Sequence, residues 1–133
     1  MKKLTVEATI DNLCTVIGFV SAELEPYECP PDLQGQIDMA VEEIFINIAN
    51  YSYHPGSGKV SIGISAGEEA VIRFEDTGKP YNPMKQPDPE LDKPLSEREI
   101  GGLGVFLVKQ LMDEIEYTRL DNKNVLIIRK RIS

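Results

Sequence analysis

The chain has no tryptophan, one histidine and two cysteines among its 133 residues. The cysteines, Cys14 and Cys29, lie far apart in the sequence and belong to no Cys-x-x-Cys pair. A structural zinc site needs several cysteine or histidine ligands, and His54 is the only histidine that the sequence offers. We therefore expect neither a zinc site nor a disulfide framework, but reduced thiols in a cytoplasmic protein.

The sequence also lacks an excess of basic residues and a long apolar run. Its formal net charge is -8, and direct binding to nucleic acid is not expected, because that binding depends on basic side chains that neutralise phosphates. No apolar run approaches the roughly 20 residues that cross a bilayer, so we expect no contact with a membrane. Alternating rather than continuous apolar residues follow Met1-Lys2-Lys3, which argues against a signal peptide. An acidic surface of this kind suits a protein partner.

Hydrophobic periodicity predicts an α+β fold. Strict alternation of apolar residues indicates strands, and apolar residues at helical spacing indicate helices. The expected elements are a strand at 3–8, helices at about 11–25 and 32–51, strands at 60–65 and 70–75, a long loop, a helix from 101, and strands at about 114–120 and 124–131. This order predicts one domain, residues 1–133, built as a two-layer α/β sandwich. Helices would cover one face of a mixed, mostly antiparallel sheet.

The loop at about 79–100 stands apart from the rest of the chain. It contains five of the nine prolines and shows neither strand nor helix periodicity. A structureless segment of this length inside a compact domain is usually functional, often as a lid over a binding site. A lid is therefore the leading interpretation, and a mobile linker is the alternative.

The second predicted helix carries three polar residues, Glu43, Asn47 and Asn50, at spacings that place them on one face. Most of the remaining circumference is apolar, as in a buried helix. A buried carboxylate and two carboxamides are costly unless a ligand or partner satisfies them. Asparagine oxygen suits Mg²⁺ when phosphates and waters complete its ligands. The helix thus predicts either the floor of a metal or phosphate pocket or a polar face exposed to water.

Two glycine-containing segments have a similar double interpretation. The Asp76-x-Gly78 sequence is either an ordinary turn or a carboxylate placed to accept the exocyclic amine of adenine. The run at 101–104 lets the backbone approach a ligand closely, and the N–H groups that open the following helix can bind phosphate. By contrast, residues 56–59 lack the first glycine and the Ser or Thr of a Walker A loop, which excludes that motif.

Together, the three segments resemble the sequence boxes of the GHKL superfamily, which is named for gyrase, a heat-shock chaperone, histidine kinases and MutL. Residues 41–53 resemble its N box, 75–83 its first glycine box and 101–117 its second glycine box. The proline-rich loop takes the position of the ATP lid, and order and spacing agree along residues 35–131. Within the superfamily, the Leu-Met-Asp-Glu continuation of the last box resembles the small anti-sigma-factor serine/threonine kinases.

The resemblance implies a Bergerat-type ATP-binding fold, with ATP and Mg²⁺ as cofactors. The implied reaction transfers the γ-phosphate to a Ser or Thr of an anti-anti-sigma protein of the STAS type. A sigma factor would be a further partner, transcription regulation the output, and a homodimer the assembly. The alternative function is a non-catalytic module that controls a protein partner through nucleotide binding.

The N box also implies roles for individual residues. Asn47 matches the asparagine that binds Mg²⁺, and Glu43 matches the catalytic glutamate, a general base toward a protein hydroxyl. Asn50 lies one helical turn beyond Asn47, and we expect it to line the same pocket. The sequence departs from the family at Tyr51, where many members have histidine. This departure leaves ATP binding as expected but places efficient phosphate transfer in question.

The glycine boxes imply the remaining roles. Asp76 matches the aspartate that reads adenine, and Gly78 allows the base to approach. The phosphate cradle is matched by the residues that open the third helix, Gly102, Leu103 and Gly104. In the lid, Lys93 and Arg98 would balance phosphate charge, an expectation that rests on their charge and position alone.

Overall fold

The computed structural model describes residues 1–53, 56–85 and 102–133, and the predicted helices and strands are all present there. The strands are β1 (Lys2–Glu7), β2 (Lys59–Ser65), β3 (Glu69–Asp76), β4 (Glu114–Leu120) and β5 (Lys123–Arg131). The helices are α1 (Leu13–Leu24), α2 (Pro31–Asn47) and α3 (Gly102–Leu111). Shorter helical turns are η1 (Ile10–Asn12), η2 (Glu25–Tyr27), the π-helical η3 (Ile48–Ser52) and η4 (Pro83–Lys85).

The five strands form one sheet in the order β1-β2-β3-β5-β4. The sequence predicted a mixed, mostly antiparallel sheet, and every pairing between the described strands is in fact antiparallel. Hairpins join β2 to β3 and β4 to β5. The pairs β1–β2 and β3–β5, which no hairpin joins, are antiparallel as well. The turn of the second hairpin contains Asp121 and Asn122, both with positive φ. This conformation suits tight two-residue hairpins, and Asp and Asn tolerate it well.

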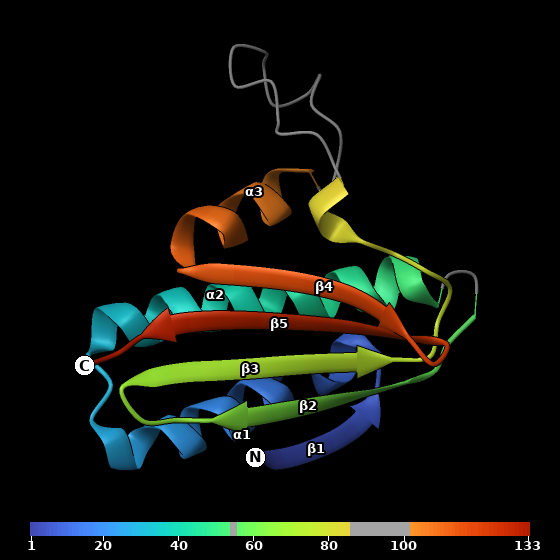
Figure 1. Ribbon diagram of the computed structural model, residues 1–133. Coiled ribbons are helices and arrows are strands. Elements are labelled where there is room, and N and C mark those ends of the chain that lie inside the picture. Colours follow the sequence, from blue (N-terminus) through green and yellow to red (C-terminus); the bar gives the residue numbers. More distant parts are fainter. Residues whose placement is uncertain (54–55, 86–101) are drawn as a thin grey trace.

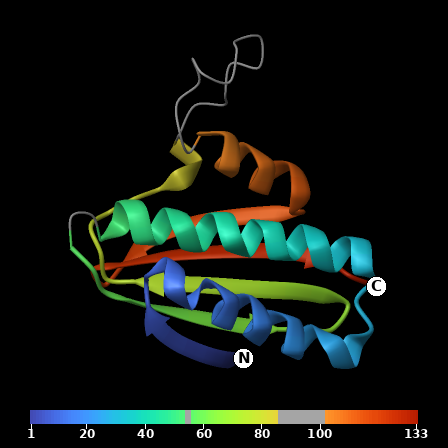
Figure 2. The ribbon, with the colours of Figure 1, turned by 180° about the vertical axis from the view of Figure 1, so that it is seen from behind.

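Helices α1 and α2 cover one face of the sheet, and α3 lies beside β4 and packs against α2 (Figures 1 and 2). The predicted apolar stripe of α2 points into the core between the two layers: Ile37 and Val41 are fully buried there. The inward-facing residues of the central strands, such as Phe74, meet it from the sheet side. Alternation in the strands and helical spacing in α2 thus bury apolar residues from both layers in one core.

Tyr53, directly after η3, fixes the chain that follows α2 against the sheet. Its hydroxyl donates to the carbonyl of Lys59 at 2.6 Å and accepts the backbone N–H of Thr77 at 2.8 Å. A Cβ at Gly58 would lie 2.2 Å from the Tyr53 ring, so this position must be glycine for the ring to pack here. These contacts hold the chain that follows α2 beside the start of β2 and the end of β3, where the predicted site residues lie.

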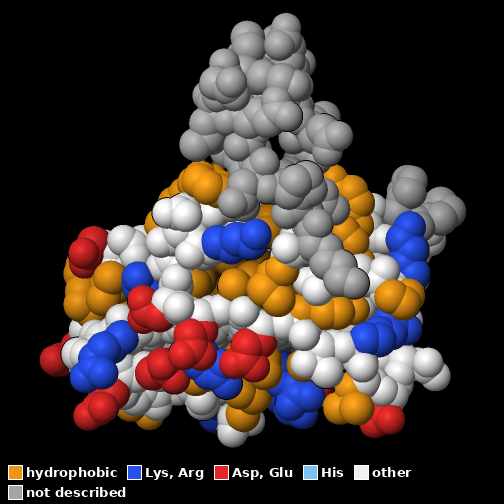
Figure 3. Space-filling model, turned by 45° about the horizontal axis from the view of Figure 1, so that its top comes forward, with side chains coloured by type: hydrophobic (Ala, Val, Ile, Leu, Met, Phe, Trp, Pro, Cys, Tyr) orange, Lys and Arg blue, Asp and Glu red, His pale blue; other side chains and the backbone are white. Residues whose placement is uncertain are grey.

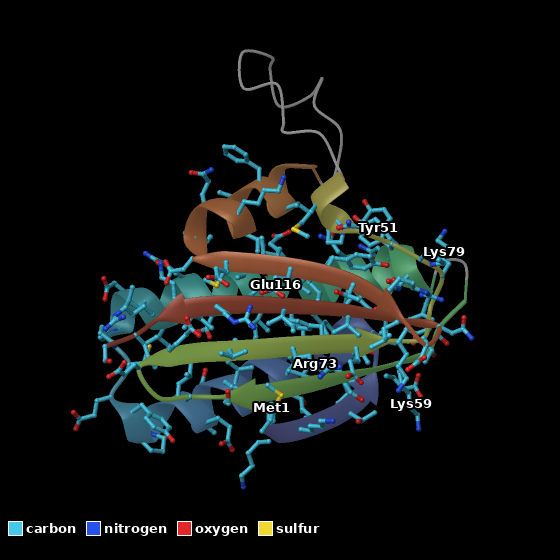
Figure 4. The ribbon with its side chains drawn as sticks, in the orientation of Figure 1. Met1, Tyr51, Lys59, Arg73, Lys79 and Glu116 are labelled. Atoms are coloured by element: carbon cyan, nitrogen blue, oxygen red, sulfur yellow. The ribbon has the colours of Figure 1, made fainter. Side chains whose placement is uncertain are left out.

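None of the described helices covers the other face of the sheet (Figures 1 and 2), which carries interspersed charges. Arg73 pairs with Glu75 at 2.5 Å, and Arg129 pairs with Glu116. Figure 3 shows acidic and basic side chains next to one another on the surface, and in Figure 4 Arg73, Glu116 and Met1 lie on this open face. Within residues 1–53, 56–85 and 102–133, no helix has the length and hydropathy of a membrane span.

Candidate active site

A cavity lies between the end of α2 and the sheet. Two of the predicted site residues, Asn47 from α2 and Asp76 from the end of β3, face each other across it. The remaining lining residues come from α2, η3, the segment after β3, and β4 and β5: Ile44, Ile48, Ser52, Tyr81, Pro83, Tyr117, Asn124 and Leu126. Apolar walls with a few convergent polar groups are typical of small-molecule sites.

Asp76 is the most constrained polar residue of the cavity. Only 4% of its surface is exposed. Its Oδ1 atom accepts the backbone N–H of Gly78 at 3.0 Å and the side-chain amide of Asn124 at 2.9 Å. These two donors act on Oδ1, and the side chain of Ser52 also hydrogen-bonds the carboxylate.

Burial raises the pKa of Asp76 above the ordinary value of an aspartate. The hydrogen bonds from Asn124, the Gly78 N–H and Ser52 act in the opposite direction, as does the charge of Arg119. Burial disfavours the ionised form, whereas each donor stabilises it. Because the pKa is raised overall, the effect of burial is larger than that of the donors. Perturbed carboxylates in cavities are frequent at functional sites.

Gly78 packs directly against the backbone at the end of the π-helical turn. A Cβ at this position would lie 2.3 Å from the carbonyl oxygen of Ser52 and 2.7 Å from its carbonyl carbon. The next residue, Lys79, donates its N–H to the same Ser52 oxygen at 2.9 Å, and Arg119 donates to the Gly78 carbonyl at 2.8 Å. The structure therefore requires glycine at 78 so that the chain leaving β3 can lie against η3.

Sequence reasoning missed Asn124, which lies near the start of β5 and is only 4% exposed. Its amide donates to Asp76 and, at 2.8 Å, to the carbonyl of Lys79. Its oxygen accepts the backbone N–H of Tyr81 at 3.2 Å and the hydroxyl of Tyr117. A signal was present in the sequence, because Asn124 shares the inward phase of the buried apolar residues that follow it in β5.

Asn47 is the polar residue of α2 that the cavity contains. It is 6% exposed, and among the described residues no side chain or backbone group hydrogen-bonds its carboxamide. A carboxamide that lines a cavity can bind a ligand there. The described part of the chain holds no cluster of three or more His, Cys, Asp or Glu suited to a metal ion. A metal at Asn47 would therefore need phosphate and water for its other ligands, as Mg²⁺ often does.

Glu43 lies one helical turn before Asn47 and meets the first turn of α3. A Cβ at Gly104 would lie 2.1 Å from the Glu43 Oε2 atom, so the carboxylate rests against the glycine backbone. Burial raises the pKa of Glu43, and the charge of Glu42 adds to this effect. The structure thus brings Glu43 and Gly104 together, although neither belongs to the lining of the cavity.

Asn50 departs from the prediction. It is exposed and absent from the cavity lining, because α2 changes into the π-helical turn after Asn47. The wider π-helical repeat rotates later residues out of the phase that regular helical spacing predicts. Gly102 and Leu103 open α3 as predicted. Lys93 and Arg98, like most of the predicted lid at about 79–100, lie outside the described residues.

Tyr51 lies where many members of the GHKL superfamily have histidine, and its ring stacks on Tyr81. The ring centroids are 5.1 Å apart with an interplanar angle of 21°. Because Tyr81 lines the cavity, the stacked pair supports one of its walls. Figure 4 places Tyr51 near the end of the sheet where Lys79 also lies.

Comparisons with known proteins agree with this architecture. A serine-protein kinase RsbW of Oceanobacillus iheyensis is 30% identical over 122 residues, which cover 81% of this chain and 66% of the relative. A serine/threonine-protein kinase BtrW of Bordetella bronchiseptica is 25% identical, with coverage of 72% and 69%. A serine-protein kinase RsbW of Bacillus mycoides is 23% identical, with coverage of 92% and 73%. The chain thus spans about two thirds of the length of these relatives.

Two solved structures share the fold. One contains the RsbU and RsbW domains of a Mycobacterium tuberculosis protein, with a TM-score of 0.64 and 14% identity over 99% of this chain and 33% of that chain. The other is the Acinetobacter baumannii histidine kinase AdeS, with a TM-score of 0.55 and 14% identity over 100% of this chain and 70% of that chain. The family model of the histidine kinase-like ATPase domain matches residues 6–130. The chain therefore belongs to the family of histidine kinase-like ATPase domains, the GHKL type that its sequence boxes predicted.

Proposed function

We propose that the chain binds Mg·ATP in the cavity between α2 and the sheet and transfers the γ-phosphate to a Ser or Thr of a protein partner. The partner would be an anti-anti-sigma protein of the STAS type, and a sigma factor would be the regulated target. The observation that carries the proposal is the buried carboxylate of Asp76, which lines the cavity and is held there by hydrogen bonds from Gly78 and Asn124. A preformed acceptor of this kind fits the exocyclic amine of adenine.

In this proposal, different residues of the site bind different parts of the nucleotide. Asp76 accepts the amine of the base, and Gly78 keeps the neighbouring backbone close to η3. Asn47 provides an oxygen for Mg²⁺, which neutralises phosphate charge when it is bound. The backbone N–H groups at the start of α3, at Gly102, Leu103 and Gly104, would receive the phosphates.

Glu43 is the proposed general base. During transfer, the hydroxyl oxygen of the partner forms a bond to the γ-phosphorus, the bond from that phosphorus to the bridging oxygen breaks, and ADP leaves. Glu43 accepts the hydroxyl proton, so charge and atoms balance. Its raised pKa makes the carboxylate a stronger base than an ordinary glutamate.

The names of the relatives support a kinase over a stand-alone hydrolase. Three relatives at 23–30% identity are named as serine or serine/threonine kinases. The acidic balance of the chain, with a net charge of -8, also suits a protein partner rather than nucleic acid. A homodimer remains part of the proposal on the strength of the family resemblance.

The decisive experiment for the kinase compares wild type with Glu43→Gln in two assays. Nucleotide affinity is measured by calorimetry, and phosphate transfer to a purified STAS-type partner is measured with labelled ATP. The proposal expects Glu43→Gln to keep its affinity within about twofold and to lose transfer by at least about a hundredfold, the scale on which general bases contribute. Equal transfer by wild type and variant would remove the role assigned to Glu43.

A second candidate function is a regulator that binds nucleotide without transferring phosphate. The stacking of Tyr51 on Tyr81 favours it, because this position carries no imidazole in this chain. The same pair of assays separates the two functions. ATP binding without transfer to any STAS-type partner would support the regulator.

A further inference from the structure

Asn124 uses every hydrogen bond that its side chain can make. A carboxamide has two N–H donors and an oxygen with two lone pairs. The two donors go to Asp76 and to the carbonyl of Lys79, and the oxygen accepts from the Tyr81 N–H and the Tyr117 hydroxyl. Because no capacity remains, Asn124 has no free group for a ligand even though it lines the cavity.

The four partners of Asn124 belong to the parts of the cavity that would recognise a base. Asp76 supplies the acceptor, while Lys79 and Tyr81 belong to the segment that leaves β3 and carries the aromatic wall. Tyr117 lines the cavity from β4. One buried side chain therefore connects the acceptor to the wall, and the two cannot shift independently.

The side-chain amide of Asn124 donates its hydrogen bond to Asp76, and this affects the charge of the Asp76 carboxyl group. The Asn124 amide makes the largest of the contributions that oppose the effect of burial on the pKa of the Asp76 carboxylate. A donor at 2.9 Å stabilises the ionised form, which is the form that accepts an amine. The same bond fixes Oδ1 and with it the orientation of the carboxylate that lines the cavity.

We propose that Asn124 is the positioning residue for base selection: it orients the carboxylate of Asp76, and it fixes the wall at Tyr81 against it. This inference rests on the proposed binding of ATP and adds a specificity determinant to it. Asn124 acts through Asp76 and Tyr81 and does not touch the nucleotide. Replacing Asn124 should therefore lower the affinity for ATP more than the affinity for a nucleotide whose base lacks the 6-amino group.

The test uses three full-length variants. Asn124→Ala removes the donor. Asn124→Asp keeps the shape but can donate to Asp76 only while the two carboxyl groups share a proton. Asn122→Asp is the matched control, because it places the same charge on the exposed turn of the same hairpin without contacting Asp76.

Affinities for Mg·ATP and for the Mg complex of purine riboside triphosphate, which has no 6-amino group, are measured by calorimetry from about pH 5 to about pH 8.5. Thermal unfolding confirms that each variant is folded. We expect Asn124→Ala to lose at least about tenfold in ATP affinity at neutral pH and distinctly less for the analogue. Its ATP affinity should also begin to fall at a higher pH than that of wild type, because Asp76 has lost a donor.

Asn124→Asp keeps the test decisive if the alanine variant does not fold. Its ATP affinity should decline as the pH rises, when the shared proton leaves and two carboxylates repel, whereas wild type and Asn122→Asp stay level there. A purely structural role would instead weaken both nucleotides equally at every pH, and that result would overturn the inference. If wild type itself binds no nucleotide, the proposed function fails before Asn124 is tested.

Discussion

The two ends of the candidate site differ in how fully the protein satisfies its own polar groups. At the base end, Asp76, Gly78 and Asn124 are joined by hydrogen bonds to one another and to neighbouring backbone. At the phosphate end, the carboxamide of Asn47 has no hydrogen-bond partner among the described residues, and Glu43 simply rests against Gly104. One end is built in advance of the ligand, and the other has groups that a ligand would satisfy.

This difference follows from the chemistry that each end is proposed to perform. Recognising a base needs a fixed acceptor and a fixed wall, which a network of buried hydrogen bonds provides. Binding a metal and transferring a phosphate needs free ligands and a carboxylate that can take up a proton. We therefore expect mutations that disturb the packed backbone at the base end to lower the stability of the protein, and mutations at the phosphate end to reduce function without unfolding it.

The largest effect on ATP affinity is expected from Asp76→Asn. The new amide would place a donor where the exocyclic amine needs an acceptor, and hydrogen bonds to a charged group contribute about 1.5–3 kcal/mol. We expect ATP affinity, measured by calorimetry, to fall by at least about tenfold and up to about a hundredfold.

The stability of Asp76→Asn should not fall in parallel, because the variant no longer buries a charge. Its unfolding midpoint in urea reports this directly. Glu75→Gln is the matched control, since that side chain lies on the open face of the sheet. Wild-type affinity in Asp76→Asn would contradict base recognition by this carboxylate.

Gly78 and Gly104 allow a second comparison of the two ends, because a Cβ added at each position would meet a different kind of neighbour. Gly78→Ala would force a Cβ into the carbonyl group of Ser52, which is rigid backbone, and overpacking of this kind costs about 1–3 kcal/mol. Gly104→Ala would meet the Glu43 carboxylate, the end of a flexible side chain, and alanine favours a helix by about 1 kcal/mol over glycine.

We therefore expect Gly78→Ala to lower the free energy of unfolding and Gly104→Ala to leave it unchanged or raise it. Gly104→Ala should instead reduce phosphate transfer, because the new methyl group displaces Glu43. Urea denaturation and the transfer assay measure the two effects on the same preparations. A large loss of stability in Gly104→Ala, or none in Gly78→Ala, would break the distinction between the ends.

The smallest and most gradual effect is expected from pH. The pKa of Asp76 is raised by burial, so ATP binding should weaken as the pH falls toward that raised value, earlier than for an ordinary aspartate. The contribution of the same group to stability has the opposite sign. Protonation removes the cost of the buried charge, so its contribution to the free energy of unfolding increases as the pH falls through the folded-state pKa.

Calorimetric affinities and urea midpoints over the same acidic range would show these opposing trends. Asp76→Asn should abolish both dependences that arise from this carboxyl group. Parallel changes in affinity and stability would instead indicate that the protein simply unfolds.

Much of the fold could be predicted because its signals are local. Alternation in β2 and β3 and the apolar stripe of α2 correctly indicated their structures and buried faces. Asn50 could not be placed, because regular helical spacing does not anticipate the π-helical turn that begins after Asn47. That turn depends on tertiary contacts, among them the Lys79 N–H bonded to the Ser52 carbonyl.

The candidate site was predictable to the extent that it lies in sequence boxes. Asp76 and Asn47 were identified by motif, and the structure places both at one cavity. Asn124 was missed because its importance comes from partners more than 40 residues away, which no local pattern records. Only its inward phase in β5 distinguished it from an ordinary turn residue.

We propose above all that the cavity binds Mg·ATP and that the side chain of Asn47 is the ligand that the protein provides to the metal. The most direct test is a calorimetric titration of ATP with and without Mg²⁺ for wild type, Asn47→Ala and the exposed control Asn50→Ala. We expect Mg²⁺ to raise the ATP affinity of wild type and of Asn50→Ala, and to leave the ATP affinity of Asn47→Ala unchanged. Absence of ATP binding by wild type, or an undiminished effect of Mg²⁺ in Asn47→Ala, would contradict this proposal.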